Sequence, residues 1–197
     1  MKKLHLVLGL APALALAACG GNETANTTTT TDTTVDNSTE LPADANAADN
    51  VVAADAAASP GQKFANDVGA SDYYEIEAGK LAQEKAQAQG LKDFGKLMVE
   101  HHTASTEKLK GAGAKASPAI TPNPALTVEQ EANLEALRKA EGAAFDTAYK
   151  TQQVAAHEKA LTLVKGYAAD GDVPELKKFA GEAEKIVQAH LSKIKGL

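Results

Sequence analysis

Apolar residues recur three or four positions apart along most of the chain beyond residue 59, which is the spacing of one face of an α-helix. No run alternates with a period of two for long, so the pattern predicts no β-strand. Glycine and proline interrupt the periodic segments near Gly90, Pro118–Pro124, Gly142 and Gly171. The expected helices cover residues 60–89, 91–112, 128–140, 143–169 and 173–195.

Helix-capping residues precede several of these segments. Ser59 is a suitable N-cap, and Pro60 suits the first turn of a helix. Thr127 and Gln130 have the spacing of a capping box, and Asp172 is expected to cap the last helix. Tight turns follow the first and third long helices, while a longer connection joins the two resulting hairpins. We therefore expect an all-α fold, a four-helix bundle with one long crossover that contains a short extra helix.

The first 18 residues have the pattern of a targeting segment. Lys2 and Lys3 precede an apolar run over 4–16 that is too short to span a membrane. The run leads into Leu-Ala-Ala-Cys, which resembles the lipobox of bacterial lipoproteins, where cleavage precedes a cysteine that is then lipidated. We therefore expect a signal peptide over 1–18 and a lipid on Cys19. This cysteine is the only one, so no intrachain disulfide can form.

Residues 19–59 are expected to form a disordered tether. Beyond the cysteine the segment contains no Lys, Arg or aromatic residue, and it carries seven acids. Such a composition cannot bury enough apolar surface to offset its chain entropy. Gly20 follows the cysteine, whereas an Asp there typically retains lipoproteins at the inner membrane of bacteria with two membranes. We therefore expect a lipid anchor in the outer membrane, with the domain of residues 60–197 in the periplasm.

Composition and charge add to this picture. Aromatic residues are only 4% of the chain and Trp is absent, while alanine is the commonest hydrophobic residue, which favours helices over a β-sandwich. The chain has a net charge of −6, and nearly all of its excess acid lies in the tether, because residues 60–197 carry 18 basic and 19 acidic residues. A nearly neutral domain gives no indication of nucleic-acid binding.

Each long helix places one ionisable side chain on its predicted apolar face. These candidate metal ligands are Glu77, His102, His157 and His190. The residues expected beside them, in supporting or structural roles, are Tyr73, His101, Asp146 and Tyr149. Burying an ionisable group without a partner is costly, so the four should contact one another, a water molecule or a metal ion. The alternative is that each histidine is an ordinary core residue with a satisfied hydrogen bond.

The expected depth of these groups in the bundle is uneven. Glu77 and His102 lie at similar separations from Gly90, so we expect them to pair across the first hairpin, with His102 inside. The second hairpin is less regular, since His157 lies 14 residues before its turn and His190 lies 19 residues after it. The mismatch corresponds to about 7.5 Å along a helix axis.

Four sequence words resemble the bacterial family known as domain of unknown function 4142. They are EIEAGKLAQEKA (75–86), DFGKLMVEHHT (93–103), GAAFDTAYKTQQVAAHEKAL (142–161) and FAGEAEKIVQAHL (179–191). The resemblance spans about residues 62–195 and implies a ferritin-like helical bundle, often secreted or lipid-anchored. His102, His157 and His190 fall on the family's histidines, whereas His101 stands where the family usually has an acid.

The chain lacks the ligand pattern of ferritin-like di-iron proteins. Those proteins use Glu-x-x-His on two helices, whereas Met or Val stands three residues before each candidate histidine here. An imidazole-rich and carboxylate-poor set suits a divalent metal such as Zn or Cu better than a carboxylate-bridged pair of irons.

Three functional hypotheses follow from the sequence. The leading one is a non-enzymatic, lipid-anchored periplasmic module that binds a metal ion or small ligand through His and Glu inside the bundle. The rival is an envelope stress or protein-interaction module with no ligand. A metal-dependent redox enzyme is a third and weaker hypothesis. No catalytic residue is expected, because Ser105 near His102 is a pair that helices produce by chance.

The lipidation site can be tested directly. Cys19→Ser removes the only thiol, so the variant should appear in the soluble fraction, whereas the parent chain should sediment with the membranes. Fractionation followed by immunoblotting measures this. A variant that is cleaved normally and still sediments with membranes would refute the lipoprotein prediction.

Overall fold

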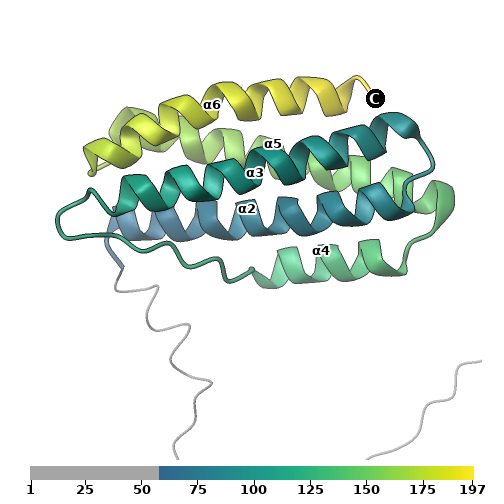
Figure 1. The fold of residues 1–197 in the computed structure, drawn as a ribbon, viewed down its shortest axis with the longest axis horizontal. Helices are drawn as coiled ribbons and strands as arrows, with labels where there is room; N and C mark the ends of the chain where they lie inside the picture. Colours follow the sequence, from purple (N-terminus) through teal and green to yellow (C-terminus); the bar gives the residue numbers. More distant parts are fainter. Residues whose placement is uncertain (1–57) are drawn as a thin grey trace, which may run out of the picture. The chain divides into compact units, whose positions relative to one another are not determined.

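The computed structural model describes residues 58–197, and the predicted signal peptide and nearly all of the predicted tether lie outside this range. The described chain contains five helices and no strand. The helices are α2 (Pro60–Lys85), α3 (Gln89–Gly113), α4 (Val128–Lys139), α5 (Gly142–Asp170) and α6 (Pro174–Lys195) (Figure 1). The all-α prediction is confirmed.

The four long helices form a bundle of two antiparallel hairpins. Helix α2 pairs with α3, and α5 pairs with α6 (Figure 1). The hairpins pack together through α3 against α6 and through α2 against α5. After α3 the chain runs back along the bundle and enters α4, which packs on α2 and α5. This is the expected four-helix bundle with one long crossover that contains a short helix.

Two of the three expected caps are present. The Ser59 side chain accepts a hydrogen bond from the Gln62 backbone N–H, and both hydrogen bonds of the Thr127–Gln130 capping box are formed. The expected cap of the last helix is wrong, because Val173 is the N-cap residue of α6. Asp172 instead accepts a hydrogen bond from the Tyr167 hydroxyl at 2.8 Å.

The first hairpin turns earlier than the sequence suggested. Helix α2 ends at Lys85 and α3 begins at Gln89, so Gly90 lies inside the first turn of α3. The Asp146 carboxylate of α5 holds this turn, because it accepts backbone hydrogen bonds from Gln87 at 2.9 Å and from Ala88 at 3.0 Å. Asp146 therefore acts as a structural cap far along the sequence. Gly90 makes room for the C-terminus, since a Cβ there would lie 2.9 Å from a methyl group of Leu197.

The buried face of α2 differs from the predicted one. The sequence pattern placed Tyr73 inside, but this side chain is 45% exposed. Small residues form much of the buried face because α2 and α3 approach closely, and a Cβ on Gly79 would lie 2.6 Å from the Gly95 carbonyl oxygen. One row of buried residues has an alternating spacing of four and three along α2 and its C-cap: Gly61, Ala65, Val68, Asp72, Glu75, Gly79, Ala82 and Ala86.

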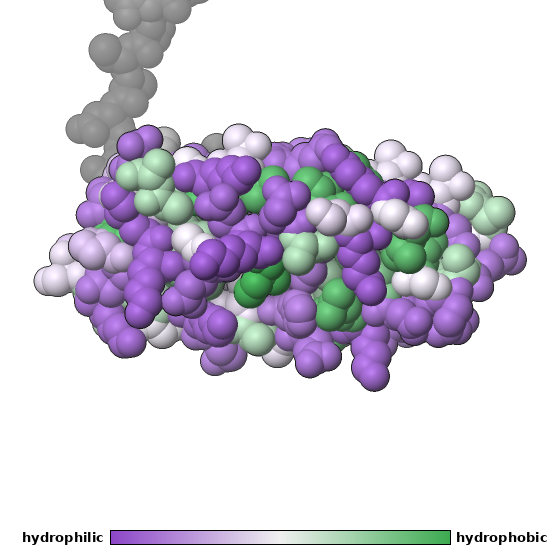
Figure 2. All heavy atoms as spheres, turned by 90° about the horizontal axis from the view of Figure 1, so that it is seen from above, coloured by the Kyte–Doolittle hydropathy of each residue, from purple (hydrophilic) through white to green (hydrophobic). Residues whose placement is uncertain are grey.

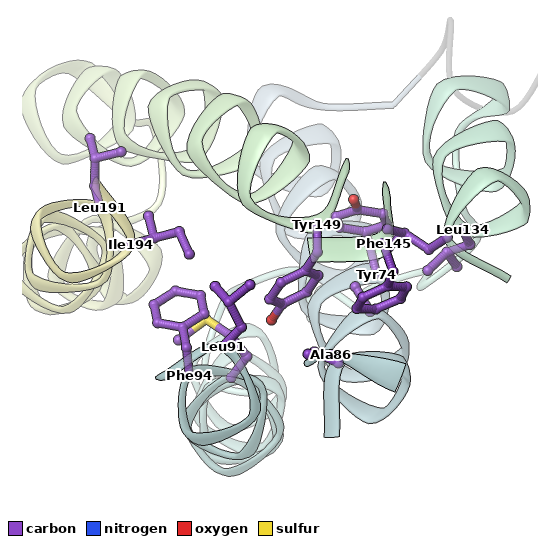
Figure 3. Close-up of a cluster of buried hydrophobic side chains, with 13 residues drawn as sticks. Tyr74, Ala86, Leu91, Phe94, Leu134, Phe145, Tyr149, Leu191 and Ile194 are labelled. Atoms are coloured by element: carbon purple, nitrogen blue, oxygen red, sulfur yellow. The ribbon is translucent and has the colours of Figure 1, made fainter. Parts of the chain in front are cut away.

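Two apolar clusters fill the bundle. One gathers large side chains from all five helices, including Phe94 and Met98 of α3 and Phe145 and Tyr149 of α5 (Figure 3). The other is built around Phe64 and includes residues from the opposite ends of the long helices. Between the two clusters every long helix contributes at least one buried polar residue: Asp72, Glu75, His102, Gln153, His157 and His190. A polar layer therefore separates two apolar ones.

The outer surface is mainly polar. Seen from above the view of Figure 1, hydrophilic side chains cover most of the face, with smaller hydrophobic areas between them (Figure 2). Among the described residues, no helix has the length and apolar character needed to cross a membrane.

Candidate metal centre

Three buried histidines from three helices converge in the polar layer. They are His102 of α3, His157 of α5 and His190 of α6, with exposures of 8%, 2% and 2%. Each offers one ring nitrogen such that the three atoms lie within 4.8 Å of one another. Nε2 of His157 is 3.3 Å from Nδ1 of His190. We refer to these three residues as the histidine triad.

Hydrogen bonds at the outer nitrogens orient two of the triad rings. His102 donates its Nδ1–H to the carboxylate of Asp72 at 2.7 Å, and His157 donates its Nδ1–H to the Gln153 carbonyl oxygen at 2.8 Å. When these two rings are neutral, the proton is on Nδ1, so Nε2 carries the free lone pair. Nε2 of His102 is buried and has no hydrogen-bond partner within the described chain. Such outer-nitrogen contacts are the usual support of a metal-ligating histidine.

The third triad ring is held from the solvent side by the neighbouring histidine of α3. Nδ1 of His101 lies 2.8 Å from Nε2 of His190, so one of these two nitrogens carries the bridging proton. His101 is exposed, and His102 is buried as expected. The adjacent pair therefore contacts the same centre from two sides, with His102 inside the triad and His101 behind His190.

A second buried carboxylate lies behind His157. Glu75 is 2% exposed, and its Oε1 is 3.8 Å from Nδ1 of His157. Its Oε2 has no hydrogen-bond partner in residues 58–197, and the same holds for the Tyr149 hydroxyl and the side-chain amide of Gln153. Burial, followed by the charge of Glu75, raises the pKa of Tyr149 well above its ordinary value, so this hydroxyl stays protonated. The centre thus includes two buried carboxylates, Asp72 and Glu75.

The three triad histidines differ in acidity. Burial, followed by the charges of the neighbouring histidines, lowers the pKa of His190 to about 3. Burial also lowers the pKa of His157, against the opposing effect of Glu75. Burial alone would lower the pKa of His102 too, but the hydrogen bond with Asp72 and the charges of Glu75 and Asp72 outweigh it and raise that pKa. His102 is therefore the triad member that retains a proton most readily.

One predicted pairing is wrong. Glu77 was expected opposite His102, but it is only partly buried and forms an ion pair with Lys80 at 2.7 Å. Asp72 takes its place beside His102. The two α2 positions are five residues apart, which turns them by roughly 140° around the helix, so they cannot face the same partner. Glu77 does not reach the triad.

The other supporting residues have structural positions. Tyr73 points to the surface, and Asp146 caps the turn before α3. Tyr149 is fully buried and stacks on Phe145 in the apolar cluster, with ring centroids 5.9 Å apart (Figure 3). None of these three side chains has a hydrogen bond to a triad ring among those of the described chain.

Asp72, Glu75 and Gln153 are buried at the centre but were not among the residues predicted from the sequence. A signal for the first two was present, because they continue the four–three spacing of small residues along α2. Gln153 lies four residues before His157, which puts it on the same face of α5. The expected buried face of α2 was defined by its large side chains, but the helix buries mainly small ones, so the two acids were not expected on the buried face.

The expected depth mismatch between His157 and His190 does not separate them. In an α-helix every side chain leans toward the N-terminus of its own helix. The ring of His157 therefore leans away from the α5–α6 turn, while the ring of His190, whose backbone lies farther from the turn, leans back toward it. The two rings meet, with centroids 5.4 Å apart.

Comparison with known proteins supports the family and the fold. The sequence profile described as "Domain of unknown function (DUF4142)" matches residues 46–197, as the sequence words predicted. No curated protein shows significant sequence similarity to the chain. Among solved structures, that of CopM in the Cu(I)-bound form is similar, with a TM-score of 0.57 and 17% identity over 69% of this chain and 93% of that one. At this identity the likeness is one of helical fold.

The acidity of His190 predicts a pH dependence of stability. Its pKa is about 3 in the folded chain against an ordinary value of 6.5, so between these values the unfolded chain binds more protons. The free energy of unfolding of the metal-free protein should therefore fall as the pH is lowered through this range. Urea unfolding at neutral pH and at about pH 4.5 measures this free energy. It should decrease less between the two pH values for His190→Gln than for the parent chain. An equal loss in both would contradict the neutral, buried state of His190.

Proposed function

Because the chain belongs to the DUF4142 family, whose description assigns it no reaction, we propose a function from the site itself. The bundle binds one divalent transition-metal ion through His102, His157 and His190. The observation that carries this proposal is the convergence of three buried imidazoles. Protein acceptors hold the outer N–H of His102 and His157, and the inner Nε2 of His102 has no partner among the described residues. Proteins orient metal-ligating histidines in this way.

Charge balance favours a divalent ion. Asp72 and Glu75 are both 2% exposed, and buried carboxylates need compensating positive charge. Three neutral imidazoles contribute none, so a doubly charged ion at the triad would offset both carboxylates. Without metal, a proton on His102 can balance Asp72, in line with its raised pKa. Metal binding therefore competes with a proton at His102.

The donor set favours Zn²⁺ or Cu²⁺. Imidazole nitrogens suit both ions, and Cu²⁺ generally binds such sites more tightly than Zn²⁺. CopM is Cu(I)-bound in its own structure, so copper belongs among the candidates for this chain. A carboxylate-bridged pair of irons fits poorly, because the chain lacks Glu-x-x-His. The carboxylate oxygens known to contact the triad do so at its outer nitrogens, Asp72 Oδ1 at His102 and Glu75 Oε1 at His157.

The role we propose is metal holding at the cell envelope, without catalysis. The lipobox around Cys19 and the acidic tether support a lipid-anchored chain whose bundle faces the periplasm. The groups that contact the triad rings support holding, since the Asp72 carboxylate, the Gln153 backbone carbonyl and the His101 ring each bind an imidazole nitrogen. An interaction module with no ligand is the competing proposal, and metal titration separates the two.

The central experiment is titration of the purified, chelator-treated protein with Zn²⁺ and Cu²⁺ by isothermal calorimetry. One ion should bind per chain, and the bound form should unfold at higher temperature because the metal stabilises the folded state by mass action. His157→Gln removes one ligand of the three and should weaken binding by at least about 100-fold, whereas His101→Gln should retain a stoichiometry of one. Tight binding that survives His157→Gln unchanged, or no binding by the parent, would refute the proposal.

A matched pair of carboxylate variants on α2 refines this test. Asp72→Asn changes the acceptor of the His102 N–H and should lower metal affinity about 10–100-fold. Glu77→Gln alters an acid of the same helix that pairs with Lys80, so it should leave affinity unchanged. Equal effects of the two substitutions would show that α2 acts only through general charge.

A further inference from the structure

A side pocket opens next to the triad. It has a volume of about 260 Å³ and is bounded by α3 and α6, with residues of α2 and α5 contributing to its wall. The imidazoles of His101, His102 and His190 line one part of it. Most of the remaining wall is apolar and includes Val164, Phe179, Ala183, Ile186 and Val187. We refer to this space as the lateral pocket.

The triad supplies three nitrogen donors. Among residues 58–197, no fourth His, Cys, Asp or Glu places a ligand atom within 4.8 Å of all three. Oδ1 of Asp72 and Oε1 of Glu75 lie at the outer nitrogens of His102 and His157. A site with three protein ligands keeps a coordination position for an external ligand. Two of the three triad rings line the lateral pocket, so an external ligand can approach from there.

The charge of the centre constrains that ligand. The two positive charges of a divalent ion would be cancelled by the buried carboxylates of Asp72 and Glu75, so the metal centre would already be neutral. An anionic donor would add a further negative charge beside Asp72 and Glu182, which also line the pocket with a single lysine, Lys108, and this is unfavourable next to a mainly apolar wall. A neutral nitrogen or sulfur donor avoids this cost, and an apolar body on the donor would fill the pocket wall.

Building on the proposed metal function, we propose that the lateral pocket binds a small neutral ligand with an apolar body, whose nitrogen or sulfur donor completes the coordination of the metal. The apolar wall selects the body of the ligand, and the metal at the triad selects its donor atom. The pocket is thus a ligand site in its own right, beside the metal site.

The test uses the protein loaded with Co²⁺, whose visible absorption reports the ligands around it. The probe is 4-phenylimidazole, with imidazole as the same donor without the apolar body and benzoate as an anion with one. We expect 4-phenylimidazole to change the spectrum in a saturable, one-to-one manner, at least tenfold more tightly than imidazole. Benzoate should leave the spectrum unchanged.

A matched pair of α6 variants locates the binding. Ala183→Phe places a large side chain in the lateral pocket and should weaken 4-phenylimidazole at least tenfold without preventing Co²⁺ binding. Ala189→Phe makes the same change on the exposed face of α6 and should have no effect. Equal affinities for 4-phenylimidazole and imidazole, insensitivity to Ala183→Phe, or tighter binding of benzoate would overturn the pocket proposal while the metal site stands. Failure of Co²⁺ itself to bind would overturn both.

Discussion

The hydrogen bond between the Asp72 carboxylate and Nδ1–H of His102 is the interaction on which the polar layer depends. It is 2.7 Å long, both residues are buried, and it links the two helices of the first hairpin. It directs the other nitrogen of His102 toward His157 and His190, and it raises the pKa of His102 while burial alone would lower it. Without Asp72, neither the orientation nor the charge of this ring would be defined.

Close helix packing makes that bond possible. Gly79 and Gly95 let the backbones of α2 and α3 approach, since a Cβ at either position would lie within 2.7 Å of the facing carbonyl oxygen. A short acid such as Asp72 can then reach across to His102. The bond lies between the two apolar clusters and both of its residues are largely buried, which strengthens it and makes an unpaired partner costly.

Much of the fold could be predicted from the sequence, because hydrophobic spacing and caps are local signals. The capping box at Thr127, the hairpins and the inward position of His102 were predicted correctly. The acidic partner of His102 was not, because Asp72 lies in a buried row made mainly of small residues, whereas large side chains such as Tyr73 defined the expected face of α2. The turn before α3 was misplaced for another reason: its cap, Asp146, lies almost 60 residues away in the sequence.

X-ray absorption of the metal-loaded protein tests the central claim most directly, because it identifies the atoms bound to the ion. The account predicts a first shell of nitrogen scatterers at about 2.0–2.1 Å, with the outer-shell pattern of three imidazoles. His157→Gln should reduce that pattern to two rings. A first shell dominated by oxygen, with no imidazole scattering, would contradict the assignment of His102, His157 and His190 as the metal ligands.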